Sequence, residues 1–184
     1  MKKVIAVIGD NSVDQGSIVY NLAFQVGKAL IDEGYRIQSG GLGGVMEAVF
    51  AGAHTSEHYV DGDTIAIIPS FNRSKVNIYA DIIIPTGLDV MRNMLVANAD
   101  AVVAIGGGAG TLSEMAIAWS LYRLIIAFKN AEGWSSKLAD IPIDARIRYD
   151  IPSDRVYGVE FVSEMIQILH DNIDRYNRVH HGIR

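Results

Sequence analysis

Short runs of apolar residues alternate along the chain with longer segments whose apolar residues recur at helical spacing. The short runs are apolar on successive residues instead of on every second one, which is typical of strands covered on both faces. We predict strands at 3–10, 35–41, 63–70, 80–87, 101–107 and 124–130. We predict helices at 18–34, 44–53, 89–99, 111–123 and 158–176, with irregular structure over 131–158.

This alternation of strand and helix restricts the fold to a narrow class. It predicts a parallel sheet whose strands are joined by right-handed crossovers. We therefore expect a single doubly wound, Rossmann-like α/β domain over residues 1–176, with helices on both faces of one parallel sheet. Residues 177–184 are expected to form a flexible tail.

The amino-acid composition limits the kinds of molecule that this chain is expected to bind. The net charge of −5 argues against binding to nucleic acid, which usually requires a basic face. The absence of cysteine excludes disulfides and thiolate metal sites, and it fits a cytoplasmic location. The first apolar run ends at Gly9 and no later stretch reaches eighteen apolar residues, so neither a signal peptide nor a membrane span is expected.

Two glycine clusters each follow a predicted strand and open a predicted helix. In a doubly wound fold the ligand lies beyond the carboxyl ends of the strands, and helix N-termini suit phosphate. Glycine also lets a ligand approach the backbone closely. We predict a phosphate cradle from Gly40, Gly41, Gly43 and Gly44 together with Gly106, Gly107, Gly108, Gly110 and Thr111. The alternative is that these glycines serve only in tight turns.

Common named motifs do not fit the chain. Gly106 and Gly108 begin a dinucleotide fingerprint, but Thr111 stands where its third glycine is required. Neither cluster is followed by the lysine of a P-loop. The segment HTSEH (54–58) matches a zinc-peptidase pattern, yet it lies where a helix is ending and lacks a third ligand, so we predict a surface turn and no metal. His180 and His181 belong to the predicted tail.

The segments SGGLGGVME (39–47) and GGGAGTLSE (106–114) together resemble the Lonely Guy-type phosphoribohydrolases, a superfamily long labelled "possible lysine decarboxylase". Three further segments resemble more closely a branch that includes the molybdenum-cofactor carrier proteins of algae: IPTGLDVMRN (84–93), GGGAGTLSEMAIAW (106–119) and GWSSKL (133–138). The resemblance covers the order of elements over roughly residues 3–130. It is specific for the superfamily and not for an activity.

The resemblance implies roles for particular residues. Gly107, Gly108, Gly110 and Thr111 would hold a 5′-phosphate, and Glu114 would act near the ribose while an N-glycosidic bond is cleaved. A carboxylate suits that reaction because positive charge develops on the sugar. Thr111 and Glu114 are three residues apart and so share one face of a helical turn. The alternative is a capping box, which the same T-x-x-E spacing would also produce.

Two departures favour the carrier-like branch over the enzymes. Gly106 stands where the enzymes usually carry proline. The enzymes also carry an Arg-Lys pair in the preceding helix, whereas this chain has MRNM (91–94), which puts Arg92 one residue out of place. One residue corresponds to about 100° around a helix. Arg92 is still suited to phosphate, and we keep it beside Glu114 as a candidate catalytic residue.

Two functions follow from these observations. The first is binding of a phosphorylated, nucleotide-like small molecule, with the molybdenum cofactor as the cargo and no other cofactor required. The second is hydrolysis of nucleoside 5′-monophosphates to free base and ribose 5-phosphate. Lysine decarboxylation is disfavoured because that reaction normally needs pyridoxal phosphate bound to a lysine, and no lysine here lies in a sequence pattern typical of such a site. The resemblance implies a homo-oligomer, and ligand specificity is expected from loops at 10–17, 71–79 and 131–146.

Overall fold

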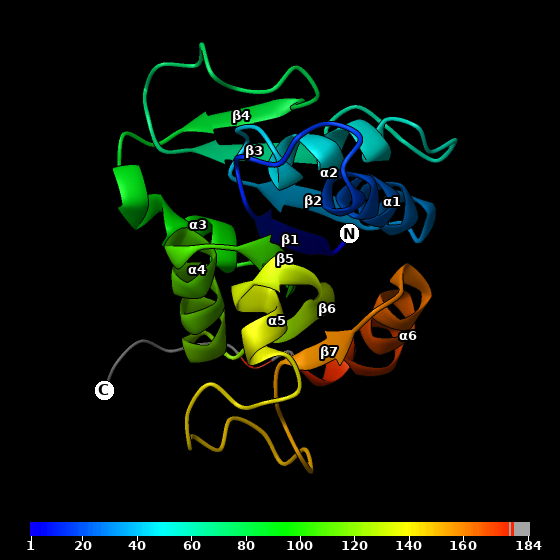
Figure 1. The fold of residues 1–184 in the computed structure, drawn as a ribbon, viewed down its shortest axis with the longest axis vertical. Helices are drawn as coiled ribbons and strands as arrows, with labels where there is room; N and C mark the ends of the chain where they lie inside the picture. The colour runs from blue at the N-terminus through cyan, green and yellow to red at the C-terminus, as the bar shows by residue number, and fades with distance from the viewer. Residues whose placement is uncertain (177, 179–184) are drawn as a thin grey trace.

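A computed structural model of the chain describes residues 1–176 and residue 178, so the predicted tail, with His180 and His181, lies almost entirely outside the described residues. The structure contains a seven-stranded sheet in the order β4-β3-β2-β1-β5-β6-β7 (Figure 1). Every pair of neighbouring strands runs parallel. The predicted doubly wound α/β fold is confirmed.

The elements alternate along the chain as the sequence predicts. The strands are β1 Val4–Gly9, β2 Arg36–Ser39, β3 Thr64–Ile68, β4 Ile82–Pro85, β5 Ala101–Gly107, β6 Leu124–Gly133 and β7 Tyr157–Val159. The helices are α1 Ile18–Asp32, α2 Val45–Ala53, α3 Asn93–Ala97, α4 Ala109–Ser120, α5 Trp134–Leu138 and α6 Val162–Asn172. Two 3₁₀ turns, η1 Asp89–Arg92 and η2 Ile173–Arg175, lie next to α3 and α6.

The central strand β1 shows why the apolar runs do not alternate. Ile5 and Val7 point to one face, into a core shared with α1, α2 and α6. Ala6 and Ile8 point to the other face, into a core shared with α3 and α4. All four side chains are at most 1% exposed. Because helices cover both faces, each strand residue is buried whichever way it points.

Four short elements differ from the sequence prediction. The strand β7 lies across the end of the segment 131–158, which was expected to be irregular, and the helix α5 lies within it. They contain three and five residues, too few to show a hydrophobic period. The helix predicted over 89–99 is divided into the 3₁₀ turn η1 and the short helix α3. This division determines where Arg92 lies.

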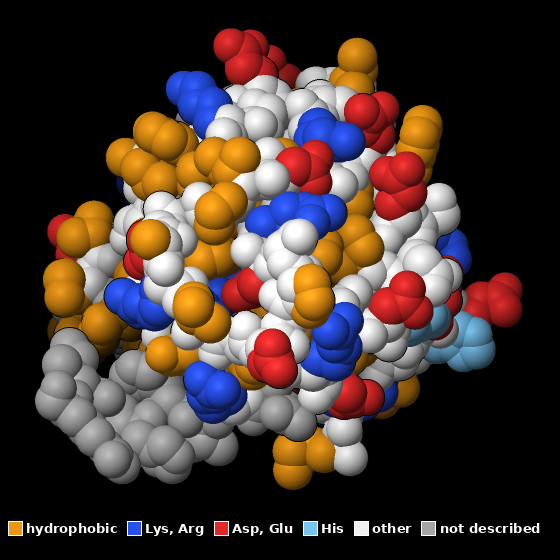
Figure 2. Space-filling model, turned by 90° about the horizontal axis from the view of Figure 1, so that it is seen from below, with side chains coloured by type: hydrophobic (Ala, Val, Ile, Leu, Met, Phe, Trp, Pro, Cys, Tyr) orange, Lys and Arg blue, Asp and Glu red, His pale blue; other side chains and the backbone are white. Residues whose placement is uncertain are grey.

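The strand order determines where a ligand can bind. The strands from β1 to β4 extend the sheet in one direction, whereas β5 pairs with the opposite side of β1. The sheet therefore changes direction between β1 and β5, and open α/β sheets bind ligands beyond the carboxyl ends of the strands at such a point. In the described part of the chain, no helix is long and apolar enough to cross a membrane. Figure 2 shows one face of the molecule, where acidic and basic side chains are interspersed instead of forming a basic stripe.

Candidate functional site

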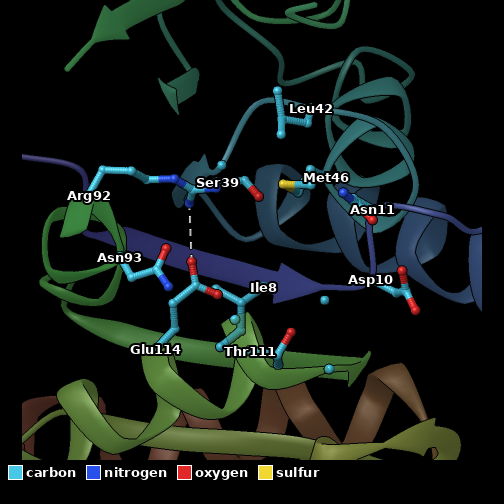
Figure 3. Close-up of a pocket in the computed structure, with 14 residues that line it drawn as sticks. Ile8, Asp10, Asn11, Ser39, Leu42, Met46, Arg92, Asn93, Thr111 and Glu114 are labelled. Atoms are coloured by element: carbon cyan, nitrogen blue, oxygen red, sulfur yellow. Dashed lines mark hydrogen bonds and ion pairs between the residues drawn. The ribbon is translucent and has the colours of Figure 1, made fainter. Parts of the chain in front are cut away.

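A cavity of about 270 Å³ opens where β1, β2 and β5 end (Figure 3). Its walls come from the ends of β1 and β2 and the loops after the three strands, from the start of α2, from the junction of η1 with α3, and from the first turns of α4. The lining residues are Ile8, Gly9, Asp10, Asn11, Ser39, Gly40, Leu42, Met46, Arg92, Asn93, Gly108, Gly110, Thr111 and Glu114. The cavity thus lies at the change of direction in the sheet.

The first turn of α4 forms one wall of the cavity. The helix begins at Ala109, and Gly108 is its N-cap without a side-chain cap hydrogen bond. The capping-box alternative for Thr111 and Glu114 is therefore wrong, because Thr111 already lies inside the helix. The amides of this turn have no helical acceptors and carry the positive end of the helix dipole, which favours an anion here.

Gly108 and Gly110 open this wall to a ligand. A Cβ atom added to either residue would meet no heavy atom within 4 Å. Neither residue has the positive φ that would by itself require glycine. Since both line the cavity, the missing side chains leave room beside the helix start instead of relieving a crowded turn.

Gly106 and Gly107 have a different role from Gly108 and Gly110, although they belong to the same cluster. They end β5 with positive φ values of 62° and 90°. The Gly106 amide donates a hydrogen bond to Ser135 Oγ at 2.7 Å. A Cβ on Gly107 would collide with the side chain of Thr111. These two residues shape the turn and do not line the cavity.

The first glycine cluster contributes only Gly40 to the cavity wall. The other three glycines lie elsewhere: Gly41 packs against Ala66, while Gly43 and Gly44 pack against the loop after β1. The first amide of α2, on Val45, donates a hydrogen bond to the Asp10 carbonyl at 2.9 Å. The Asp10 carbonyl therefore occupies the first amide of α2, and of this cluster Gly40 is the glycine that faces the cavity.

Arg92 and Glu114 meet at one end of the cavity (Figure 3). Arg92 Nη1 lies 3.2 Å from Glu114 Oε1, and the two residues are only 9% and 7% exposed. Burial raises the pKa of Glu114 to about 7, although the positive charge of Arg92 acts in the opposite direction. Burial also lowers the pKa of Arg92, against the influence of Glu114. The pair therefore places a carboxyl group that titrates near neutral pH beside a guanidinium.

The position of Arg92 depends on the break between η1 and α3. Arg92 is the last residue of η1 and the N-cap of α3. The sequence predicted that Arg92 would be turned by about 100° along one continuous helix. That rotation does not apply, because the helix is interrupted at Arg92. Arg92 Nε is buried without a hydrogen-bond partner among the described residues. The guanidinium thus retains a donor that Glu114 does not use.

Several polar residues of the cavity were not singled out from the sequence. Asn93 lies with Nδ2 3.4 Å from Ser113 Oγ, and Ser39 Oγ donates to the Val7 carbonyl at 2.6 Å. Asp10 Oδ1 accepts the Ser12 amide at 2.8 Å. Asp10 and Ser39 could have been predicted from their position at the ends of strands, where a ligand binds in this fold. Asn93 could not, because its position depends on the division of the predicted helix.

The HTSEH segment lies outside this cavity. His54 Nε2 is 2.9 Å from the Tyr79 carbonyl and 2.8 Å from Tyr59 Oη, so its ring is bonded within the protein. His58 is exposed. No cluster of three or more His, Asp or Glu side chains suited to a metal ion occurs in the described part of the chain.

Comparison with known proteins gives a family. A family model described as LDcluster4, the SLOG cluster4 family, matches residues 2–149. An uncharacterized protein of Archaeoglobus fulgidus is 39% identical over 126 residues, which span 68% of this chain and 79% of that protein.

Solved structures agree with the fold and with the resemblance. The molybdenum cofactor binding protein of Rippkaea orientalis is 30% identical, with a TM-score of 0.77 over 94% of this chain and 98% of that one. The molybdenum cofactor carrier protein of Chlamydomonas reinhardtii is 23% identical, with a TM-score of 0.75 over 95% and 99%. At the latter identity the likeness concerns the fold alone. The predicted relation to the carrier-like branch is confirmed.

Proposed function

The chain belongs to the SLOG cluster4 family, and from this premise we propose that it binds a phosphorylated, nucleotide-like small molecule in the cavity at the ends of β1, β2 and β5. The leading candidate is the molybdenum cofactor, a pterin that ends in a phosphate group, carried as cargo. The name of the relative from Rippkaea orientalis supports this ligand class. We further propose a cytoplasmic location, which the absence of cysteine fits, and a homo-oligomer, which the resemblance implies.

One observation carries the proposal, namely the convergence of anion-binding groups on a single cavity. The open side of Gly108 and Gly110 lies at the start of α4, where unpaired amides favour phosphate. Thr111 lines the same cavity. Arg92 supplies a guanidinium, the side chain whose donor geometry best matches phosphate.

The size of the cavity indicates how much of the ligand it encloses. Its volume of about 270 Å³ lies slightly below the usual range for pockets that bury a drug-sized molecule, roughly 300–1,000 Å³. A phosphate with an attached sugar or small ring fits such a volume. The remainder of a larger ligand would extend beyond this cavity.

Titration calorimetry with inorganic phosphate, GMP and a molybdopterin-type ligand tests binding. We expect all three to bind, and we expect Thr111→Val to weaken each by about fivefold, since it removes one hydroxyl without changing the shape of the side chain. Thr55→Val makes the same change outside the cavity and serves as the control. If the folded wild-type protein binds no phosphorylated ligand, the proposal is wrong.

A second function is favoured by one specific observation, the Arg92–Glu114 pair. A carboxyl group with a pKa of about 7 can exchange a proton at neutral pH, as a general acid or base must. In hydrolysis of a nucleoside monophosphate, water would supply hydroxide to the sugar carbon and a proton to the departing base. The bond between that carbon and the base nitrogen would break.

Release of free base from AMP or GMP distinguishes the two functions. Hydrolysis predicts turnover that disappears in Glu114→Gln and persists in Glu47→Gln, which alters a glutamate on α2 outside the cavity lining. Tight binding without any release of base supports the carrier-like function. Turnover that survives in Glu114→Gln would exclude Glu114 as the catalytic carboxylate.

A further inference from the structure

A second cavity, of about 320 Å³, lies next to the first, at the end of β3. The two cavities share one side chain, that of Leu42, which stands at the edge of the first cavity in Figure 3. Ile68, Pro69 and Val76 add further apolar surface to the second cavity. The polar lining residues come from the loop that follows β3 and are Ser70, Asn72, Ser74 and the cationic Lys75.

Leu42 is held in place between the two cavities. The amide of Asn77 donates to the Gly41 carbonyl at 3.0 Å, and Asn77 Nδ2 donates to the Leu42 carbonyl at 3.0 Å. Gly41 has a φ of 73° and packs closely against Ala66. These contacts join the loop after β2 to the loop after β3, so the wall between the cavities is built before a ligand arrives.

The loop over the second cavity is also ordered by its own side chains. The amide of Asn72 donates to Ser70 Oγ at 2.9 Å, and the amide of Ser74 donates to Asn72 Oδ1 at 2.9 Å. Such local side-chain bonds stabilise turns. The loop therefore presents Asn72 and Ser74 at fixed positions beside the apolar surface.

The two cavities have complementary chemistry. The first offers Arg92, Thr111 and the start of α4 to an anion, whereas the second offers apolar side chains with a few polar groups. A ligand that matches both linings joins an anionic group to a mainly apolar body that carries hydrogen-bonding groups. An alkyl chain would offer nothing to the polar side chains of this cavity, whereas a heterocycle carries ring nitrogens and carbonyl oxygens that can bond to Asn72, Ser74 and Lys75.

We infer that the second cavity is the ring subsite of the ligand. In this arrangement the phosphate lies against α4, and the heterocyclic ring packs on Leu42 and Val76 with its polar edge toward Asn72 and Ser74. The inference rests on the proposed function and deepens it, because it assigns ligand selection to the loop after β3. The ligand class is an organic phosphate with one fused heterocycle, which includes guanine nucleotides and pterin phosphates.

Calorimetry on a variant with a filled second cavity tests the inference. Ser74→Trp places an indole in that cavity from an exposed position, and Ser163→Trp makes the same change on α6 as the control. GMP is the probe, because guanine carries the same 2-amino-4-oxopyrimidine edge as a pterin. Inorganic phosphate is the second probe, and we expect it at Arg92 and the start of α4 in the first cavity, which Ser74→Trp leaves unchanged.

We expect wild type to bind GMP about tenfold more tightly than phosphate, since the ring buries apolar surface. Ser74→Trp should remove most of that difference and leave phosphate affinity unchanged, which also shows that the variant is folded. Equal GMP affinity in wild type and Ser74→Trp would overturn the ring subsite while leaving the phosphate site intact. Failure of wild type to bind either probe would overturn the proposed function and the inference with it.

Discussion

Arg92 and Glu114 form a buried ion pair across the end of the cavity, with Nη1 and Oε1 3.2 Å apart. The two residues come from opposite sides of β5 in the chain, Arg92 before the strand and Glu114 in the second turn of the helix after it. Each is therefore carried by an element anchored to the same central strand. This pairing gives the cavity a carboxyl group that can exchange a proton, Glu114, in contact with a permanently positive group, Arg92.

The raised pKa of Glu114 predicts how stability depends on pH. The unfolded chain loses this proton near the ordinary value of 4.5, whereas the folded chain retains it to about 7. Between those values the folded state binds more protons, so rising pH lowers the free energy of unfolding. We expect wild type to lose roughly 3 kcal/mol relative to Glu114→Gln between pH 5 and pH 8.

Urea unfolding of both proteins at several pH values checks this expectation. Glutamine leaves Arg92 without its charged partner at every pH, so the change with pH is the quantity to compare and not the absolute stability. Parallel curves for the two proteins would show that Glu114 titrates normally in the folded state.

Substitutions of Arg92 should weaken phosphate binding by different amounts, depending on the charge and donor geometry that each new side chain keeps. Arg92→Lys keeps the charge and loses the planar donor set, so we expect phosphate affinity to fall about tenfold. Arg92→Met removes the positive charge as well as the donors and should bind more weakly still. Calorimetry with phosphate gives the order, and Arg155→Lys, which lies outside the cavity lining, is the matched control. Equal affinities in all four proteins would exclude Arg92 from the anion site.

The sequence predicts the central strands well, because each is marked by a run of apolar residues within the strand itself. The strand β5 has the predicted bounds, 101–107, since seven buried residues are followed at once by the glycines that open α4. The strand β7 and the helix α5 were missed, since each depends on contacts with distant segments more than on its own pattern. The short strand β7, for example, pairs with Ile126, Ala127 and Phe128 of β6.

The candidate site was predicted in part for the same reason. Thr111 and Glu114 lie three residues apart on successive turns of α4, so their common face follows from spacing alone. The meeting of Glu114 with Arg92 depends on the break between η1 and α3, which the apolar pattern of 89–99 does not reveal. The occupation of the Val45 amide at the start of α2 depends on the carbonyl of Asp10, a residue 35 positions earlier in the chain. A short sequence motif cannot predict such backbone contacts between distant residues.

A buried ion pair away from the cavity should be important for folding. Arg148 is fully buried, donates to the Asp154 carboxylate at 2.9 and 2.8 Å, and stacks 3.5 Å from the centre of the Trp119 ring. Asp154→Ala leaves a buried cation without its partner, and we expect a loss of about 3–5 kcal/mol in the free energy of unfolding. Asp150→Ala changes a nearby exposed aspartate and should cost little. Similar urea midpoints for the two variants would contradict this role.

Substitutions of two neighbouring glycines separate the ligand cradle from the turn that supports it. Gly110→Ala adds a methyl group where no heavy atom lies within 4 Å, and it improves the helix propensity of α4. We expect this variant to be as stable as wild type or about 0.5 kcal/mol more stable, yet to bind phosphate about tenfold more weakly. Gly107→Ala requires a φ of 90° and collides with Thr111, so it should lose roughly 2 kcal/mol or more. Thermal unfolding and calorimetry measure the two effects separately. If Gly110→Ala bound phosphate as tightly as wild type, the open side of α4 would not be where the anion lies.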